Sequence, residues 1–523
     1  MDVPLTPLEF ARRARRLYPE REAVVDGDLR FSYEQLFDRC DRWSAVLQGM
    51  GVVKGDRVAY VAPNTHAQLE SFYAVPQLGA VLVPINYRLS ADDIAYIVNH
   101  SGARVLCVHA DQLDTLDKVR DQLPSVERFV ALEDAHDGWE DYEALIAGFG
   151  SEFTRPDVAE TDLLTINYTS GTTARPKGVM ITHRNAYMNT VGTLLHLRVG
   201  VGDRYLWTLP MFHANGWTYT WTVTAAAATH VCLRAVEPAR VFELIRTEGA
   251  TWLCAAPTVL IALAGAPAEV RGTVPAGVHV VTAGASPAAA TIERLEQDLG
   301  WEVTHIYGLT ETAPFILVCE PRPEHDGLGT KERGDLKARQ GVELITSGEL
   351  KVVRDDGSDV PWDGATIGEI IVRGNVVMDG YFHDPEATEK VMGDGWFHTG
   401  DAAVTHTDGY VEIQDRLKDV IISGGENISS IEVEGVLLRH PAVREAAVVG
   451  VPHEKWGETP EAFVVLADGG SATSEEMIAF AREHLTHFKA PTAVSFVDEL
   501  PKTATGKIQK FVLRGGAPAI SRQ

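Results

Sequence analysis

Short β-rich runs alternate with helical stretches through most of the chain, and this alternation is the feature that most constrains the fold. The clearest runs are Arg57 to Val61, Arg104 to Val108 and His279 to Thr282. Such an alternation is typical of parallel sheets whose faces are covered by helices. With 523 residues, the chain is too long for a single hydrophobic core, so at least two domains are expected.

Two later regions have a different pattern. Glu349 to Val353 and Gly368 to Gly374 are short alternating runs separated by Asp-Gly turns, which predicts an antiparallel β subdomain. After Lys418 the composition indicates a compact α+β unit, with a helix from about Ser430 to Arg439, a strand from Ala446 to Val451 and a helix from about Ser474 to Leu485. We therefore predict an α/β protein with a large N-terminal domain of helix-covered sheets over residues 1–417. A small mobile α+β domain is predicted over residues 418–523.

The densest chemical motif runs from Tyr168 to Val179 and reads YTSGTTARPKGV. A β run from Leu163 enters it, and a helix is expected after His183. Glycines let the backbone approach a ligand, hydroxyls and N–H groups donate, and Lys177 neutralises charge, which suits a polyphosphate. The motif is not a Walker A loop, because Lys177 precedes Gly178 rather than following a glycine. The alternative is a Gly/Thr-rich surface turn.

This loop resembles the signature of the adenylate-forming superfamily, which includes acyl-CoA synthetases, peptide-synthetase adenylation domains and luciferases. Five further motifs of that superfamily follow in order: YGLTET at 307–312, GEIIVRG at 368–374, TGD at 399–401, DRLKD at 415–419 and PKTATGK at 501–507. The resemblance therefore extends over nearly the whole chain. It implies an enzyme that activates a carboxylic acid with ATP as an acyl adenylate and then transfers the acyl group to a thiol.

The resemblance implies roles for the residues of the nucleotide site. Tyr307 offers an aromatic face to adenine, Asp401 accepts from the ribose hydroxyls, and Glu311 supplies a hard carboxylate for Mg²⁺. Taken alone, Tyr307 could be a core aromatic and Asp401 a turn residue. The full ATP and AMP set is Thr169, Ser170, Gly171, Thr172, Thr173, Lys177, Gly284, Ala285, Ser286, Tyr307, Gly308, Thr310, Asp401, Arg416 and Lys507.

The predicted catalytic residues are Lys507, Thr310, Glu311 and His213. Lys507 matches the lysine that bridges the carboxylate of the acid and the α-phosphate, where two anions have to meet. Lys418 matches the hinge between two domain orientations. In one orientation Lys507 faces ATP. In the other, the segment Ser423, Gly424, Gly425 and Glu426 lines the tunnel for the thiol of coenzyme A, although a simple tight turn would also explain its glycines.

The segment from Pro210 to Trp217 resembles one wall of the acyl pocket in acid–CoA ligases, and Ala283 to Pro287 resembles another. The predicted pocket residues are His213, Asn215, Gly216, Trp217, Ala283, Gly308 and Phe315. Amino-acid-activating domains usually carry Asp after the aromatic residue, where this chain has His213, so an amino-acid substrate is disfavoured. Trp217 and Phe315 are bulky enough to shorten the pocket, which favours a short- or medium-chain or small aryl acid. Core packing is the alternative for both residues, and a hydrogen-bonded core position is the alternative for His213.

Composition excludes other classes of function. The net charge of −26 argues against a nucleic-acid-binding surface. The five cysteines are scattered and form no CxxC pair, which suits a reducing cytoplasmic location, and Ser521-Arg522-Gln523 is not a peroxisomal address. The most apolar stretch, Thr222 to Leu233, is too short to span a bilayer. Two alternatives remain at this point: an adenylate-forming amide or carrier-protein ligase, and a non-catalytic nucleotide-binding protein.

Overall fold

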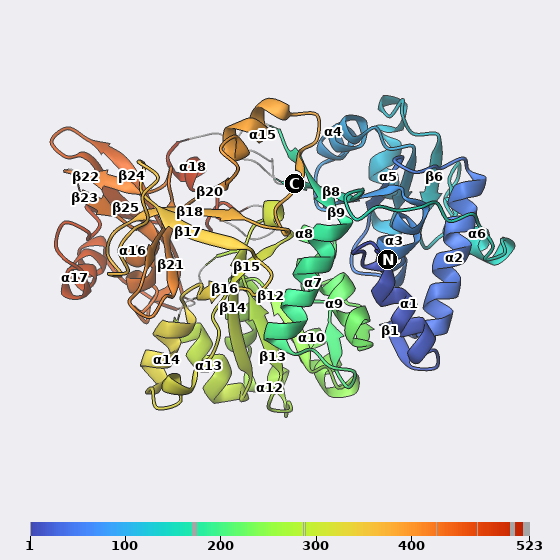
Figure 1. Ribbon diagram of the computed structural model, residues 1–523. Helices are drawn as coiled ribbons and strands as arrows, with labels where there is room; N and C mark the ends of the chain where they lie inside the picture. The colour runs from blue at the N-terminus through green and yellow to red at the C-terminus, as the bar shows by residue number, and fades with distance from the viewer. Residues whose placement is uncertain are drawn as a thin grey trace.

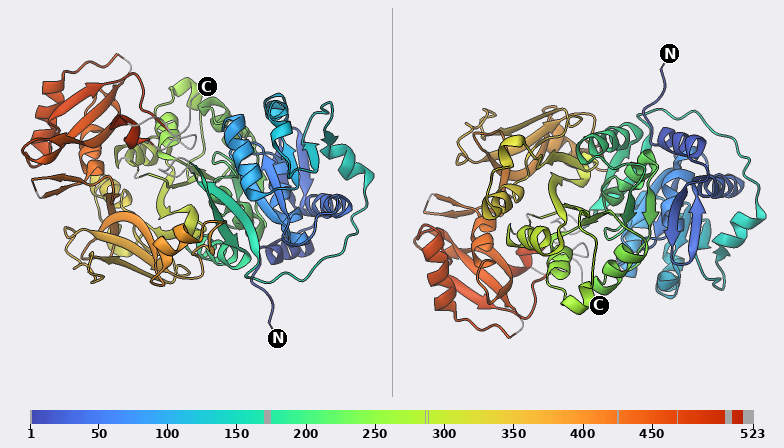
Figure 2. Two further views of the ribbon diagram at one scale, coloured as in Figure 1. Left: turned by 90° about the horizontal axis from the view of Figure 1, so that it is seen from above. Right: turned by 90° about the horizontal axis from the view of Figure 1, so that it is seen from below.

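The structure is a computed structural model that describes residues 2–169, 175–285, 287, 289–424, 426–467, 469–502 and 508–515. Two large helix-covered sheets form most of the molecule, and a smaller antiparallel sheet and a final α+β unit lie at one end (Figures 1 and 2). Among the described residues, no helix is both long and apolar enough to cross a membrane.

The first large sheet contains eight strands within the described part of the chain. Its spatial order is β19 (Gly380–Tyr381), β9 (Lys177–Thr182), β8 (Leu163–Thr169), β4 (Val81–Ile85), β3 (Arg57–Val61), β5 (Val105–Val108), β6 (Arg128–Ala131) and β7 (Glu140–Asp141). The strands from β8 through β7 run parallel, whereas β9 and β19 pair antiparallel at one edge. That edge carries the predicted phosphate-binding motif.

The second large sheet contains nine strands in the described residues. Its order is β16 (Val342–Glu343), β15 (Phe315–Val318), β14 (Glu302–Gly308), β13 (His279–Thr282), β12 (Trp252–Ala255), β10 (Arg204–Leu206), β11 (Thr229–Val231), β1 (Glu22–Asp26) and β2 (Leu29–Ser32). The central strands are parallel, and β2, β15 and β16 are antiparallel.

Helices cover both faces of each large sheet. They are α1 (Leu8–Leu17), α2 (Tyr33–Gly49), α3 (His66–Ala74), α4 (Ala91–Ser101), α5 (Ala110–Asp117), α6 (Tyr142–Gly148), α7 (His183–Leu197), α8 (Ala214–Trp217), α9 (Tyr219–Ala226), α10 (Pro238–Thr247), α11 (Pro257–Ala264), α12 (Ala268–Arg271), α13 (Ala289–Leu299), α14 (Thr330–Lys337) and α15 (Pro385–Met392). Short 3-10 turns lie at Pro76–Leu78, Arg120–Gln122, Thr310–Thr312 and Pro323–His325.

The largest hydrophobic core lies between the two sheets, where α2, α3, α7 and α9 pack against both. Strand β5 contributes side chains to the cores on both faces of its sheet. Val105 and Cys107 face this core, while Leu106 and Val108 face the outer core under α4 and α5. A third core lies under α10, α11 and α13 on the outer face of the nine-stranded sheet. Because both faces are buried, the strands read as continuous apolar runs rather than alternating ones.

The β subdomain is a four-stranded antiparallel sheet of β17 (Glu349–Val353), β18 (Gly368–Arg373), β20 (Phe397–Thr405) and β21 (Val411–Arg416). After it comes the C-terminal unit (residues 418–523). Its described elements are β22 (Ile421–Ser423), β23 (Glu426–Ile428), α16 (Ser430–Leu437), β24 (Val443–His453), β25 (Gly457–Leu466), α17 (Ser474–His484), β26 (Ala493–Phe496) and α18 (Lys510–Leu513).

The predicted α/β fold class is confirmed, and so is the antiparallel subdomain. β3, β13 and β17 have the predicted bounds, and α16 and α17 end within two residues of the predicted ends. The strand predicted from Ala446 to Val451 is longer, since β24 pairs with β25 from Val443 to His453. Arg444, Pro452 and His453 among the extra residues are not buried, so the apolar pattern of the strand does not extend over its full length.

Candidate functional site

The phosphate-loop motif lies at the edge of the eight-stranded sheet, between the antiparallel strands β8 and β9. Thr169 at the end of β8 pairs with Lys177 at the start of β9. Helix α7 begins directly after β9, where the side chain of Thr182 accepts from the Asn185 N–H at 3.2 Å. Ser170, Gly171, Thr172 and Thr173 lie outside the described residues.

Lys177 and Glu311 are linked through one tyrosine. The Lys177 Nζ lies 4.7 Å from the centroid of the Tyr381 ring, and the Tyr381 hydroxyl donates to Glu311 Oε1 at 2.9 Å. Glu311 follows Thr310 in the 3-10 turn after β14. Burial raises the pKa of Tyr381, and the Glu311 carboxylate raises it further, so the hydroxyl stays protonated as a donor. The single-residue signals of the sequence did not identify Tyr381, because its place depends on the pairing of β19 with β9.

Tyr307, Asp401 and Arg416 meet at the junction of the nine-stranded sheet and the β subdomain. The Tyr307 hydroxyl donates to Asp401 Oδ2 at 2.5 Å, and Arg416 Nε lies 2.8 Å from Asp401 Oδ1. Asp401 and Arg416 face each other on β20 and β21. The Asp401 carboxylate raises the pKa of Arg416, and burial raises the pKa of Tyr307 with Asp401 adding to the rise. An acceptor-rich carboxylate is therefore held between two fixed donors.

Gly308 ends β14 where the chain returns closely on itself. A Cβ atom at Gly308 would lie 1.8 Å from the backbone oxygen of Pro314, so no larger residue fits. On the neighbouring strand, Ala283 is buried at the end of β13, and Gly284 follows with φ of +88°. Ala285 is exposed, and Ser286 lies outside the described residues.

The predicted acyl-pocket wall contains an unusual left-handed turn. We call residues Ala214 to Thr218 the pocket turn; their φ values are +38°, +49°, +59°, +50° and +65°. Left-handed backbone costs roughly 1–2 kcal/mol for each residue that has a side chain, so the surrounding structure has to impose it. Only Gly216 takes the conformation without that cost.

Several contacts impose the pocket turn. Asn215 Nδ2 donates to Thr165 Oγ1 of β8 at 2.9 Å, and Thr220 Oγ1 donates to the Asn215 carbonyl at 3.0 Å. A hydrogen bond of 3.1 Å joins the hydroxyls of Thr190 and Thr218. Beneath the turn lies the Trp207 ring, whose Cζ3 atom would be 2.5 Å from a Cβ atom at Gly216.

Four predicted pocket residues form a continuous row of contacts. Gly308 lies against the backbone of Phe315. The Phe315 and Trp217 rings meet edge to face with centroids 6.0 Å apart, and the centroids of the His213 and Trp217 rings are 6.5 Å apart. Trp217 and Phe315 are 4% and 2% exposed. The two aromatic residues therefore pack on each other where the pocket turn meets the start of β15.

Two asparagines that the sequence analysis missed hold this row in place. Asn64, after β3, donates from Nδ2 to the carbonyls of Trp207 and Leu209 and accepts from the Met211 N–H, all within 3.0 Å. Asn189 of α7 donates to the Phe315 carbonyl at 2.8 Å. Both side chains are buried. A lone asparagine carries no sequence signal for such a role, because its partners are backbone groups remote in the chain.

Lys418 lies in a tight turn between β21 and β22, in which the Asp419 and Val420 N–H groups both donate to the Arg416 carbonyl. The hairpin after it pairs Ser423 with Glu426, and Gly424 has φ of +61° and packs against the Trp456 ring. The β22–β23 hairpin lies at the outer edge of the C-terminal unit, whereas α18 lies on the side facing β20 (Figures 1 and 2). Gly425 and Lys507 lie outside the described residues.

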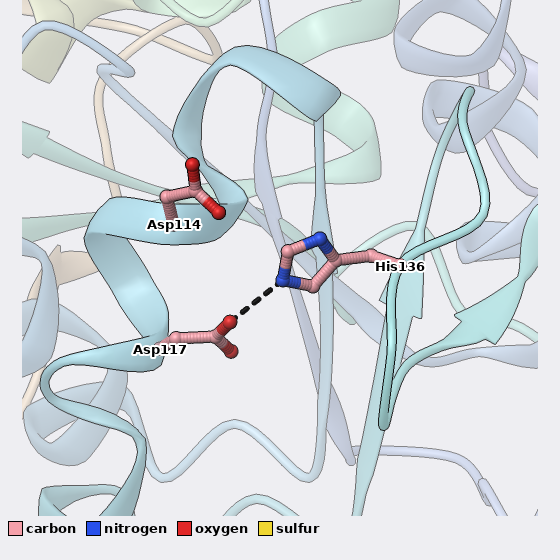
Figure 3. Close-up of side chains that lie close together, drawn as sticks. All are labelled: Asp114, Asp117 and His136. Carbon is pink, nitrogen blue, oxygen red and sulfur yellow. Dashed lines mark hydrogen bonds and ion pairs between the residues drawn. The ribbon is translucent and has the colours of Figure 1, made fainter.

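A separate cluster of metal-ligand residue types lies outside the predicted site residues. Asp114, Asp117 and His136 approach one another at the exposed end of α5 (Figure 3). Asp117 already accepts from Trp139 Nε1 at 2.8 Å and lies 2.6 Å from His136 Nε2. Its carboxylate thus fastens the loop before β7 to α5, and we assign no metal to it.

Comparison with known proteins identifies the class. Residues 10–382 match the family of AMP-binding enzymes, and residues 432–507 match the AMP-binding enzyme C-terminal domain. The chain belongs to the AMP-binding enzyme family. The predicted membership in the acid–CoA ligase branch of the adenylate-forming superfamily is thereby confirmed, as the relatives described next show.

Those relatives match over almost their full lengths. The chain is 43% identical to 4-hydroxybutyrate–CoA ligase 2 of Metallosphaera sedula, covering 98% of this chain and 95% of that protein. It is 42% identical to a peroxisomal butyrate–CoA ligase of Arabidopsis thaliana, covering 99% and 94%. The crystal structure of an anthranilate CoA ligase in complex with anthranoyl-AMP superposes with a TM-score of 0.88 at 25% identity, covering 98% of both chains.

Proposed function

We propose that this enzyme is an ATP-dependent acid–CoA ligase that works in two half-reactions. A carboxylate oxygen of the acid attacks the α-phosphorus of ATP, the bond to the β-phosphate oxygen breaks, and acyl-AMP and pyrophosphate form. The thiolate of coenzyme A then attacks the acyl carbon, and AMP leaves with the electron pair of the broken bond. The observation that carries the proposal is the Tyr307–Asp401–Arg416 cluster beside Glu311, which joins polar groups from three separate motifs.

The nucleotide is expected to bind across these groups. Asp401 pairs with Arg416 and accepts from Tyr307, and each of its oxygens keeps a further lone pair for a ribose hydroxyl. Thr169 and Lys177 flank the loop that we assign to the β- and γ-phosphates. Arg416 keeps the buried charge of Asp401 compensated when the nucleotide is absent.

Glu311 fits the metal that such a reaction uses. One of its oxygens, Oε1, accepts from Tyr381, and a carboxylate oxygen is the ligand type that Mg²⁺ prefers. Mg²⁺, when bound, would neutralise charge on the phosphates. Tyr381 orients the carboxylate, and the Lys177 ammonium over the same ring adds a second positive charge on that side.

The acid is proposed to be short-chain or a small aryl acid. The relatives named above act on 4-hydroxybutyrate, butyrate and anthranilate. The edge-to-face pair of Trp217 and Phe315 supports the same size limit, since it fills space between the pocket turn and β15. Asn215 and His213 are the polar residues of the predicted pocket set.

The C-terminal unit is proposed to rotate about Lys418, with a domain boundary at residue 417. Its helix α16 touches β21 through Asp415, which accepts from the Ser430 N–H at 3.0 Å. We assign to Lys507 the charge neutralisation of the first half-reaction, and to Ser423, Gly424, Gly425 and Glu426 the lining of the thiol path in the second. A cytoplasmic location is proposed from the buried free cysteines.

A panel of acids tests the proposal. Pyrophosphate and AMP release are measured with ATP, Mg²⁺ and acetate, butyrate, 4-hydroxybutyrate, benzoate or palmitate, each with and without coenzyme A. We expect acid-dependent pyrophosphate release, and steady AMP release only when acid and coenzyme A are both present. AMP release with an amine in place of coenzyme A would indicate an amide ligase, and a kcat/KM highest for palmitate would contradict the size limit.

A further inference from the structure

A cavity of about 340 Å³ lies at the base of the phosphate-loop motif and shares Lys177 with the nucleotide residues described above. It is bounded by α4, by the start of β9 and by the segment that follows β19. Its polar and aromatic lining residues are Tyr96, His100, Arg175, Lys177, Phe382 and Asp384. Tyr96, His100, Arg175 and Phe382 belong to none of the predicted binding sets.

The lining of the cavity carries two cations, Arg175 and Lys177, and one carboxylate, Asp384. Arg175 lies over the Tyr96 ring at 5.1 Å and Lys177 over the Tyr381 ring at 4.7 Å. Among the ion pairs of the described residues, neither cation has an acidic partner. Asp384 is the acidic residue in the lining, and its Oδ1 accepts from the Ala387 N–H at 3.0 Å as the cap of α15. Stacking on tyrosine faces holds both cations in place while leaving their N–H groups free to donate.

His100 adds a neutral donor. Its Nδ1 lies 2.7 Å from the Tyr168 hydroxyl, and aromatic rings of Tyr96, Phe382 and His383 surround it at 5.5–6.0 Å. Burial lowers the pKa of His100, and the neighbouring His383 lowers it further, so the ring is neutral at pH 7. When Tyr168 donates to Nδ1, the proton of the neutral ring is on Nε2, which is then a donor for a ligand.

Two unpaired cations and a neutral donor around a space of this size suit a compact polyanion with several acceptor oxygens. We propose that this cavity binds pyrophosphate after the first half-reaction, with Arg175 and His100 as its own ligands and Lys177 shared with the phosphate loop. The inference rests on the proposed function, which supplies pyrophosphate as the leaving group.

A diphosphate group also occurs in coenzyme A, so the experiment separates the two sources. Steady-state constants are measured for the exchange of pyrophosphate into ATP, for the forward reaction in ATP, and for the second half-reaction in coenzyme A. The variants are Arg175→Gln and His100→Gln. The control is Arg13→Gln, which also removes an exposed arginine that lies over a tyrosine ring, that of Tyr18 at 5.7 Å, in helix α1.

We expect Arg175→Gln to raise the KM for pyrophosphate about 10-fold, the loss expected for one charge-assisted contact. Product inhibition by pyrophosphate should weaken by the same factor, while the KM values for ATP and coenzyme A stay within twofold. His100→Gln should act in the same direction and less strongly, and Arg13→Gln should change nothing. An equal rise in the KM for ATP would place Arg175 in the nucleotide site instead, and a rise for coenzyme A alone, or no change, would equally overturn the proposal.

A binding measurement keeps this test independent of turnover. Pyrophosphate is titrated into the protein without ATP or acid, and its dissociation constant is compared between the parent chain and Arg175→Gln. We expect binding about 10-fold weaker in the variant. If the parent chain shows no acid-dependent exchange but binds pyrophosphate through Arg175, the proposed function fails while the site stands; if it exchanges normally and both proteins bind equally, the site fails alone.

Discussion

The pocket turn and the C-terminal unit are attached to the rest of the protein in opposite ways. Around the pocket turn, contacts come from β8, α7, α9 and the Trp207 ring, and every residue from Ala214 to Thr218 has a positive φ. The C-terminal unit is much larger, yet its polar contacts with the preceding domain gather near β21, where Ser430 and Lys510 approach Asp415. The small, strained pocket turn is therefore held by contacts from several elements, whereas the large C-terminal unit is held by few polar contacts.

The difference fits the roles that we propose for the two regions. A pocket that discriminates acids by size has to be rigid before the substrate arrives, and strain held by tertiary packing achieves this. A unit that serves two half-reactions in turn requires an interface whose free energy is small enough to be broken repeatedly. The predictions below test this contrast in order of decreasing effect.

Lys507→Ala should lower the rate of adenylate formation by about 10²–10³-fold, the effect of losing one preorganised charge. Because the unit that carries Lys507 is expected to turn away afterwards, the variant should convert pre-made acyl adenylate and coenzyme A to thioester at nearly the parent rate. The two half-reactions are measured separately, by pyrophosphate release and by thioester formation. Equal loss of both in a folded variant would show that the residue does not serve one orientation only.

Gly216→Ala should destabilise the protein by about 2–4 kcal/mol, because left-handed strain adds to overpacking against Trp207. Gly27→Ala is the matched control: Gly27 has φ of +62°, but nothing lies within 4 Å of a Cβ atom there. It should cost only the backbone strain of about 1–2 kcal/mol. Urea midpoints of both variants measure the difference, and equal shifts would mean that Trp207 does not support the turn.

The contrast also shows which parts of the molecule could be predicted. Apolar periodicity predicted β3, β13 and β17 with their observed bounds, because a strand with one or both faces buried needs apolar residues at the buried positions. The motif residues were likewise visible, and the structure joins Tyr307 to Asp401 and Arg416 as well as Lys177 to Glu311 through Tyr381.

What supports those residues was not visible. The left-handed conformation of Asn215 and Trp217 is imposed by Thr165, Thr190 and Trp207, and four of the five turn residues carry side chains that locally disfavour it. Asn64 and Asn189 act on backbone groups more than 100 positions away in the chain. Information of this kind exists only after the sheets have assembled.

Phe315→Leu should change selectivity while leaving the chemistry intact. A smaller side chain opposite Trp217 opens space for about one methylene, which is worth roughly 1–3 kcal/mol in an apolar pocket. The ratio of kcat/KM for hexanoate over butyrate should therefore rise by about 10-fold. Phe242→Leu is the control, since Phe242 is buried in the outer core under α10 and should leave the ratio unchanged.

Asp415→Asn should weaken the interface between β21 and the C-terminal unit. Asp415 accepts from the Ser430 N–H at 3.0 Å and from the Ser430 hydroxyl, and Lys510 Nζ lies 3.9 Å away. Burial lowers the pKa of Lys510, but the carboxylates of Glu434 and Asp415 outweigh that effect and raise it, so the ammonium stays charged. An amide keeps an acceptor oxygen but loses the charge. The variant should therefore lose about half of the charge-assisted stabilisation, roughly 1 kcal/mol.

In the orientation of this structure α18 faces β20 and the β22–β23 hairpin lies outside (Figure 1), and we expect this orientation to serve the first half-reaction. Asp415→Asn should therefore slow adenylate formation about fivefold relative to thioester formation. Asp419→Asn is the control, because Asp419 pairs with Arg514 of the same unit at 2.5 Å. An unchanged ratio, or the same change in the control, would show that the Asp415 contact does not favour this orientation.

Arg439→Gln should have the smallest effect of the series. Arg439, just after the end of α16, also reaches the preceding domain, where its Nη2 lies 3.3 Å from Asp335 Oδ1, but the two side chains are 46% and 44% exposed. Exposed pairs contribute about 0–1 kcal/mol and are screened by salt, so the ratio of the two half-reactions should change by less than about twofold. The ratio of the parent chain should also change little between 0.05 and about 0.5 M NaCl, because the Asp415 contact is 3% exposed and screened much less. A change in Arg439→Gln as large as that in Asp415→Asn, abolished by salt, would mean that surface charge rather than the buried contact sets the orientation of the C-terminal unit.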